Sequence, residues 1–225
     1  MVDRVTSTRW PLRADLTEGD IAAAAARYAG ATPFPHVVLD EWFDDAALRH
    51  IAELFDRPHG WRAYEDGKRA NGAVIDDPVV AAFNEAPMRE LLRRIAGGAA
   101  LLPDPTLRGG GLHAVGRGGR LGIHTDFNRH PDLPLARAVN TIIYLNREWS
   151  AEWRGQLTLT DRGEITRNID PLWNRWVVFC WGEDSWHGHP EPLACPEGVE
   201  RRSLAIYYYR ALPDDAPAFH TTRYA

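Results

Sequence analysis

The chain has 225 residues, 44% of them hydrophobic, and a formal net charge of −5 at pH 7. A chain of this length buries roughly 70% of its unfolded surface and forms a core without disulfide or metal staples, so we predict a single domain over residues 1–225. The acidic balance, without any run of Lys or Arg, argues against a nucleic-acid partner.

The cysteines and the lengths of the apolar segments indicate the cellular compartment in which the protein is expected. Cys180 and Cys195 form neither a disulfide framework nor a CxxC metal pair, and both suit a reducing compartment. Residues 1–20 contain no apolar segment of the signal-peptide type, and no stretch of about 18 apolar residues occurs anywhere. We therefore expect a cytoplasmic protein without a membrane partner, and the sequence leaves the oligomeric state open.

The chain up to about residue 100 predicts a helical layer with a little strand. Thr17 and Asp44 are candidate N-caps. Gly30 and Gly97 mark helix ends, and Pro87 breaks a helical pattern. The predicted elements, in chain order, are a helix over 16–30, a short strand over 36–43, an amphipathic helix over 44–55 and a helix pair over 79–97.

Beyond residue 100, short segments rich in β-branched and aromatic residues alternate with Gly and Pro turns. Closely spaced strands of this kind are typical of a β-sandwich or a barrel. We therefore predict an α+β fold that is mainly β, with a helical part of about residues 1–100 packed on a β-rich core of about residues 101–210. The predicted strands lie near 111–116, 121–124, 138–146, 156–160, 164–168, 175–180 and 202–209.

A histidine and an aspartate stand two residues apart in the strand segment LGIHTDF. Strand side chains alternate between faces, so His124 and Asp126 point the same way. They are either ordinary polar residues near a turn or two ligands of a metal triad that needs one more histidine. His187, which follows an apolar strand in the β-rich half, is our candidate for the third ligand, with His189 as the alternative.

The segment ERRSLAIYYYR, residues 200–210, predicts a strand that starts with Arg201, Arg202 and Ser203. Alternation places Arg201 and Ser203 on one face and Arg202 on the other. A guanidinium holds a carboxylate through two parallel hydrogen bonds, and a nearby hydroxyl adds a third. Arg201 and Ser203 are therefore a candidate carboxylate site, although a single arginine on a strand edge is more often a solvated surface residue.

The order His-x-Asp, distal His, Arg-x-Ser resembles that of the iron(II)/2-oxoglutarate-dependent dioxygenases, most of all their prolyl 4-hydroxylase-like branch. The resemblance covers roughly residues 110–210. NTIIYLN (140–146) is similar to the family strand that ends in Tyr-Leu-Asn, and GQLTLTD (155–161) to the Gly-Gly-x-Leu strand after it, with Gln156 in place of the second glycine. PFPHVVLDEWF (33–43) is similar to the strand that such proteins often carry before their first long helix.

This resemblance implies a double-stranded β-helix, or jelly roll, with a metal between its two sheets. It implies that His124, Asp126 and His187 bind Fe(II), and that 2-oxoglutarate chelates the iron through its keto-acid end. Halogenating relatives carry a small residue at the aspartate position and so open a site for chloride. The carboxylate of Asp126 therefore favours hydroxylation.

The resemblance also implies how the far carboxylate of 2-oxoglutarate is bound. Arg201 and Ser203 would hold it, with Tyr144 donating a hydrogen bond, and a register slip of one residue would replace Arg201 by Arg202. Prolyl hydroxylase-like proteins often place a tyrosine shortly before the first ligand, where this chain has His113. His113 is either a contact of the cosubstrate or substrate, or a buried core histidine.

The implied enzyme is a 2-oxoglutarate-dependent hydroxylase that acts on an unactivated C–H bond of a small molecule or a peptidyl residue. It would consume O2, release succinate and CO2, and have ascorbate as a further candidate cofactor. Two alternatives stay open: a non-catalytic jelly-roll module for binding or sensing, and a metallohydrolase that uses the same metal site. The polar loop 128–137 either lines the mouth of the site or is solvated.

Overall fold

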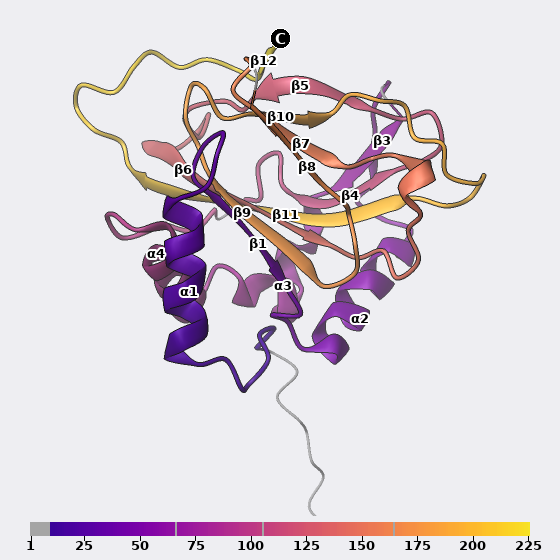
Figure 1. The fold of residues 1–225 in the computed structure, drawn as a ribbon, viewed down its shortest axis with the longest axis horizontal. Coiled ribbons are helices and arrows are strands. Elements are labelled where there is room, and N and C mark those ends of the chain that lie inside the picture. The colour runs from indigo at the N-terminus through magenta and orange to yellow at the C-terminus, as the bar shows by residue number, and fades with distance from the viewer. Residues whose placement is uncertain (1–9, 66, 105, 164) are drawn as a thin grey trace, which may run out of the picture.

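The computed structural model describes residues 10–65, 67–104, 106–163 and 165–225. Two antiparallel sheets pack face to face, and the helices cover the outer face of the larger sheet (Figure 1). The mainly β, α+β class with an N-terminal helical layer is therefore confirmed.

The helices begin where the sequence provides caps. The Thr17 hydroxyl accepts a hydrogen bond from the Asp20 backbone N–H, and the Asp20 carboxylate accepts one from the Thr17 N–H, which forms a capping box. Asp44 caps the second helix by accepting from Ala46 and Ala47. Among the described helices, none is long and apolar enough to cross a bilayer. The helices are α1 (Glu18–Ala29), α2 (Asp45–Glu53), α3 (Pro78–Ala82) and α4 (Ala86–Ala96).

The helix pair predicted over 79–97 is formed by α3 and α4, but its break does not fall at Pro87. The break lies between Ala82 and Ala86, so Pro87 occupies the first turn of α4. A proline there costs no hydrogen bond, because the first N–H groups of a helix have no partner within it. Gly97 ends α4 with a φ of 73°, as the sequence predicted.

The larger sheet has seven strands in the order β1-β9-β6-β11-β4-β3-β2. Its long central strand β11 pairs with β6 on one side and β4 on the other, so Ser203 stands opposite both Tyr144 and His113. The short strand β2 at the sheet edge and its neighbour β3 were not predicted from the sequence. The bounds are β1 (His36–Asp40), β2 (Arg62–Ala63), β3 (Lys68–Asn71), β4 (Gly111–Val115), β6 (Leu135–Tyr144), β9 (Arg175–Cys180) and β11 (Arg201–Ala211).

The smaller sheet has five strands in the order β12-β5-β10-β7-β8. Here β10 and β12 were not predicted, and β12 brings the C-terminal end of the chain against β5 (Figure 1). The bounds are β5 (Leu121–Thr125), β7 (Leu157–Thr160), β8 (Thr166–Ile169), β10 (Trp186–His189) and β12 (Arg223–Tyr224).

Two of the three apolar clusters among the described residues hold these layers together. The first lies between the helices and the larger sheet, where Ile51 of α2 and Leu92 of α4 are fully or almost fully buried with Trp176 of β9. The second lies between the two sheets and is smaller. Its buried members are Phe34, Tyr144, Leu157, Leu159, Ile169, Val177 and Phe179.

Candidate metal centre

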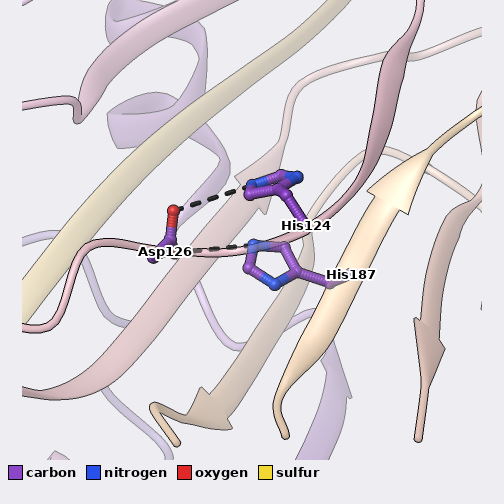
Figure 2. Close-up of side chains that lie close together, drawn as sticks. All are labelled: His124, Asp126 and His187. Atoms are coloured by element: carbon purple, nitrogen blue, oxygen red, sulfur yellow. Dashed lines mark ion pairs between the residues drawn. The ribbon is translucent and has the colours of Figure 1, made fainter. Parts of the chain in front are cut away.

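Two neighbouring strands of the smaller sheet position the candidate ligands. His187 on β10 stands directly opposite His124 on β5, and the centroids of their rings lie 4.4 Å apart. Asp126 follows directly after β5 and turns its carboxylate toward both rings (Figure 2). The antiparallel pairing of β5 and β10 therefore brings a distant histidine to the His-x-Asp pair.

The three side chains are close enough to share one ion. His124 Nε2 lies 3.6 Å from Asp126 Oδ1, and His187 Nε2 lies 3.5 Å from Asp126 Oδ2 (Figure 2). Metal bonds to imidazole nitrogen and carboxylate oxygen measure about 2.0–2.2 Å, so one ion can bridge either pair. Within the described residues, this is the one group of three or more His, Cys, Asp or Glu side chains whose ligand atoms all lie within 4.8 Å of one another.

Both histidines present the same ring nitrogen to the centre. Nδ1 of His124 lies 2.8 Å from the Gly122 carbonyl oxygen, and Nδ1 of His187 lies 3.0 Å from the Ser185 carbonyl oxygen. An Nδ1–H that donates to a carbonyl leaves the Nε2 lone pair available to a metal. In each case the carbonyl belongs to the residue two positions upstream, so the local chain itself orients the ring.

Asp126 is held by two donors from β6. Arg137 Nη2 donates to Asp126 Oδ2 at 3.2 Å, and Asn140 Nδ2 donates to the same oxygen at 2.9 Å. The guanidinium of Arg137 also donates to Asn140 Oδ1 and lies over the rings of Phe127 and Tyr207. Burial alone would raise the pKa of Asp126, but the charge of Arg137, together with the contacts to His187 and His124, outweighs burial and lowers the pKa well below its usual value. The carboxylate is therefore ionised and fixed in position.

The chemistry of this donor set fits Fe(II). Burial lowers the pKa of His187 to about 4, so its imidazole is neutral near pH 7, the form that binds a metal. Two imidazoles and one carboxylate on one side of an ion form the 2-His-1-carboxylate arrangement, which leaves further coordination positions open. The open positions are what a reaction with bound small molecules requires.

Arg201 and Tyr144 lie together on adjacent strands of the larger sheet. Buried Arg201 donates from Nε to the Gly155 carbonyl oxygen at 2.7 Å and from Nη2 to Tyr144 Oη at 2.9 Å. Burial raises the pKa of Tyr144, although Arg201 opposes the shift, so the phenol keeps its proton. Tyr144 thus accepts from Arg201 and retains an O–H to donate. Ser203, also buried, stands opposite Tyr144 in the sheet.

A cavity of about 170 Å³, here called the metal cavity, joins the candidate ligands to Arg201. Residues of both sheets line it, so it lies inside the sandwich. Tyr144 is not part of its wall and acts on the cavity through Arg201. Besides the three candidate ligands, the polar residues of its wall include Lys68, His113, His189, Arg201 and Ser203.

The two arginines at the start of β11 point to opposite sides of the sheet. Arg201 enters the metal cavity, whereas Arg202 contacts Glu200 at 3.4 Å and lies over the ring of Phe55 on the helical side. This geometry is what strand alternation predicts, and it favours Arg201 over Arg202 as the contact of a ligand in the cavity.

The remaining candidate histidines also line the metal cavity. His189 stands apart from the group of three candidate ligands, and its Nδ1 is buried without a hydrogen-bond partner. Burial lowers the pKa of His189 well below its usual value and lowers that of His113 to about 3. Both imidazoles are therefore neutral and able to offer one N–H and one lone pair.

The sequence analysis missed part of the wall and the support of this site. Arg137 and Asn140 lie three residues apart on β6, a spacing that matches no ligand motif; an arginine inside an apolar strand was the available signal. Tyr224 of β12 stands opposite His124, with ring centroids 5.6 Å apart. The C-terminal strand thus lies beyond the predicted end of the β-rich core and still reaches the site.

The polar loop after Asp126 holds the C-terminal segment. Asn128 Nδ2 donates to the Ala218 carbonyl oxygen at 2.8 Å, and Asn128 Oδ1 accepts from the His220 N–H at 3.0 Å. Arg129 donates to the Ala216 carbonyl oxygen. None of the residues 128–130 lines the metal cavity. This part of the loop therefore anchors the chain end instead of forming the wall of the site.

Comparisons with solved structures establish the fold. A prolyl-4-hydroxylase from Pseudomonas putida has a TM-score of 0.59 and 21% identity, over 84% of this chain and 98% of that one. A prolyl hydroxylase from Trichoplax adhaerens, in complex with a hypoxia inducible factor peptide fragment, has a TM-score of 0.60 and 15% identity, over 84% of this chain and 89% of that one. The carbocyclase SnoK of nogalamycin biosynthesis has a TM-score of 0.57 and 14% identity, over 87% and 84%. The predicted jelly roll is thereby confirmed.

A comparison with protein families identifies the β-rich core. No curated protein sequence matches the chain. Residues 110–209 match the family model of the 2OG-Fe(II) oxygenase superfamily, a region that includes all three candidate ligands and Arg201. Fe(II), 2-oxoglutarate and O2 are the cofactor and cosubstrates of this family, as the resemblance implied, whereas ascorbate stays a prediction. Over residues 110–209, the chain is therefore similar to the 2OG-Fe(II) oxygenase superfamily.

Proposed function

We propose that this oxygenase binds Fe(II) through His124, Asp126 and His187 and hydroxylates an unactivated C–H bond of a small molecule or a peptidyl residue, with release of succinate and CO2. The observation that carries the proposal is that the three candidate ligands and a buried arginine open into the same cavity. The metal and a dicarboxylate cosubstrate would therefore meet in one enclosed space.

Each part of the proposed site is held in place before any ligand arrives. The carbonyl oxygens of Gly122 and Ser185 set the histidine rings, while Arg137 and Asn140 set the carboxylate of Asp126. Iron, when bound with 2-oxoglutarate, supplies the oxidative decarboxylation by O2 and the oxidant for the C–H bond. The protein's own contribution is to fix geometry and to exclude bulk water.

The far carboxylate of 2-oxoglutarate is assigned to Arg201 and Ser203. Two N–H groups of Arg201 are engaged by Gly155 and Tyr144, which orient the guanidinium so that its other donors face a ligand. The hydroxyl of Ser203 lies on the same face of β11, two residues along. A metallohydrolase that works without 2-oxoglutarate would have no use for this buried arginine beside the triad.

The adjacent arginines of β11 provide a matched test of the cosubstrate site. Arg201→Ala should weaken 2-oxoglutarate binding by about 10- to 150-fold, the effect of losing a charged hydrogen-bonded pair. Arg202→Ala should leave the binding near the wild-type value, because Arg202 faces the helical layer. The measurement is an anaerobic titration of the Fe(II) protein with 2-oxoglutarate, followed by its weak metal-to-ligand absorption.

Either of two outcomes would count against this assignment. A loss of affinity in Arg202→Ala alone would shift the cosubstrate site by one residue along β11. An absence of any 2-oxoglutarate absorption in folded wild-type protein that binds Fe(II) would overturn the oxygenase proposal and favour the hydrolase or binding-module alternatives.

A further inference from the structure

A second and larger cavity lies against the metal cavity. It measures about 710 Å³, and we call it the outer cavity. Lys68, Gly109 and His113 line both cavities, so these three residues stand where the two spaces meet. A molecule in the outer cavity would lie next to the proposed iron and cosubstrate site.

The strand register explains why the two cavities are neighbours. Ser203 on β11 stands opposite His113 on β4, His113 stands opposite Ala70 on β3, and Ala70 stands opposite Arg62 on β2. Residues that are directly paired in this way present their side chains on one face of the sheet. The edge strands β3 and β2 therefore continue the inner face of the larger sheet outward, and Arg62 ends a row that starts at Ser203 inside the metal cavity.

The outer cavity is cationic. Arg62, Lys68 and Arg108 line it, and Asp132 is the single acid among its described lining residues. Arginine binds carboxylate and phosphate groups through two parallel hydrogen bonds, which makes such a wall selective for anions over neutral groups. This arrangement stands out in a chain whose formal net charge is −5.

Lys68 stands at the junction of the two cavities. It is the only lysine of the chain, and its ammonium lies 4.6 Å from the centroid of the Tyr64 ring. After burial, the charges of Lys68 and Arg201 are the next causes that lower the pKa of His113. Both cations therefore act across the same polar space, one from the cosubstrate end and one from the outer cavity.

We propose that the outer cavity binds the primary substrate, and that this substrate is a small organic anion with a carboxylate or phosphate group. The inference rests on the proposed function, because it requires an iron site to which a C–H bond is delivered. Arg62 and Arg108 bind the anionic group, and the reacting carbon enters the metal cavity between Gly109 and His113. The volume lies within the roughly 300–1,000 Å³ that is typical of small-molecule sites.

The test measures binding alone, so that it does not depend on turnover. The full chain is loaded with Mn(II) and saturating 2-oxoglutarate and titrated calorimetrically with N-acetylglutamate, phenylacetate, glucose 6-phosphate and adenosine monophosphate. Each anion is compared with its neutral amide or its dephosphorylated form. We expect at least one anion to bind and its neutral counterpart to bind about tenfold more weakly or not at all.

Variants connect the binding to the outer cavity. The double variant Arg62→Gln, Arg108→Gln should bind the anion with an affinity lower by about tenfold or more. Arg167→Gln, on the exposed strand β8 of the other sheet, should leave the affinity unchanged. Circular dichroism and the thermal midpoint show that the variants are folded.

Three results would overturn the inference. They are the absence of binding by every anion of the panel, equal binding of an anion and its neutral form, and unchanged affinity in the double variant. Failure of the proposed function looks different, because wild-type protein would then bind the anion but show no 2-oxoglutarate absorption with Fe(II).

Discussion

The metal cavity and the outer cavity share one face of the larger sheet but are built differently. In the metal cavity, the candidate ligands and Arg201 are no more than 7% exposed, and each is tied to a neighbour by the contacts described above. The outer cavity is walled by the short edge strand β2, by its neighbour β3 and by residues 106–110, and Tyr64 at its rim is 48% exposed. The proposed metal site thus resides on central strands that packing fixes, whereas the proposed substrate contacts reside on an edge strand and a loop that tolerate change.

Removal of one candidate ligand should abolish Fe(II) binding in the metal cavity and leave the outer cavity unchanged. We expect His187→Ala to lose stoichiometric Fe(II) binding, because the two remaining ligands hold an ion poorly. His189→Ala, two residues further along β10, should keep it, since His189 stands outside the group of three. Anaerobic Fe(II) titration measures both variants, and full Fe(II) binding by folded His187→Ala would remove this residue from the triad.

A substitution that removes a hydrogen bond to Asp126, but no candidate ligand, should reduce Fe(II) affinity less than loss of a ligand does. Asn140→Ala removes a donor to Asp126 without removing a ligand, and we expect about a 10- to 100-fold loss of Fe(II) affinity. Asn146→Ala is the control, because this buried amide donates to the carbonyl oxygens of Pro171 and Arg202 and contacts none of the three ligands. Equal Fe(II) affinity in the two variants would show that Asn140 does not position the carboxylate.

Two glycines allow each cavity to be disturbed separately through the backbone. A Cβ at Gly188 would lie 2.6 Å from the Gly122 carbonyl oxygen, so Gly188→Ala should push β10 away from β5 and weaken Fe(II) binding by several fold. A Cβ at Gly111, where φ is 88°, would lie 2.4 Å from the Asn71 carbonyl oxygen. Gly111→Ala should therefore displace β3 and weaken anion binding more than Fe(II) binding, as parallel titrations with Fe(II) and the bound anion would show. The opposite order would contradict the division into two regions.

Local patterns allowed the central elements to be predicted. Thr17 and Asp44 begin helices as their side-chain oxygens suggest, because capping depends on neighbours within a few residues. Strand alternation correctly turned Arg201 and Arg202 to opposite faces, because a period of two follows from strand geometry alone. The family resemblance could be recognised for the same reason, since the motifs that carry it lie on these central strands.

The elements and site residues that could not be predicted depend on contacts between segments that are distant in the sequence. Strands β10 and β12 are too short to show an alternation of apolar and polar residues in the sequence. They become visible only through their pairing, β10 with β5 and β7, and β12 with β5. Arg137 matters because it donates a hydrogen bond to Asp126, which is distant in the sequence. Lys68 matters because the fold places it in the wall of both cavities. The break before Pro87 was misplaced because proline is also favoured in the first turn of a helix.

The formation of succinate is the most direct measure of 2-oxoglutarate oxidation by this protein. Wild-type protein is incubated with Fe(II), 2-oxoglutarate and O2, and succinate and the remaining 2-oxoglutarate are quantified with and without each component. The account predicts succinate equimolar with the 2-oxoglutarate consumed, its loss when Fe(II) or O2 is omitted, and its loss in His187→Ala. Folded wild-type protein that binds Fe(II) but leaves 2-oxoglutarate unconsumed would contradict the account.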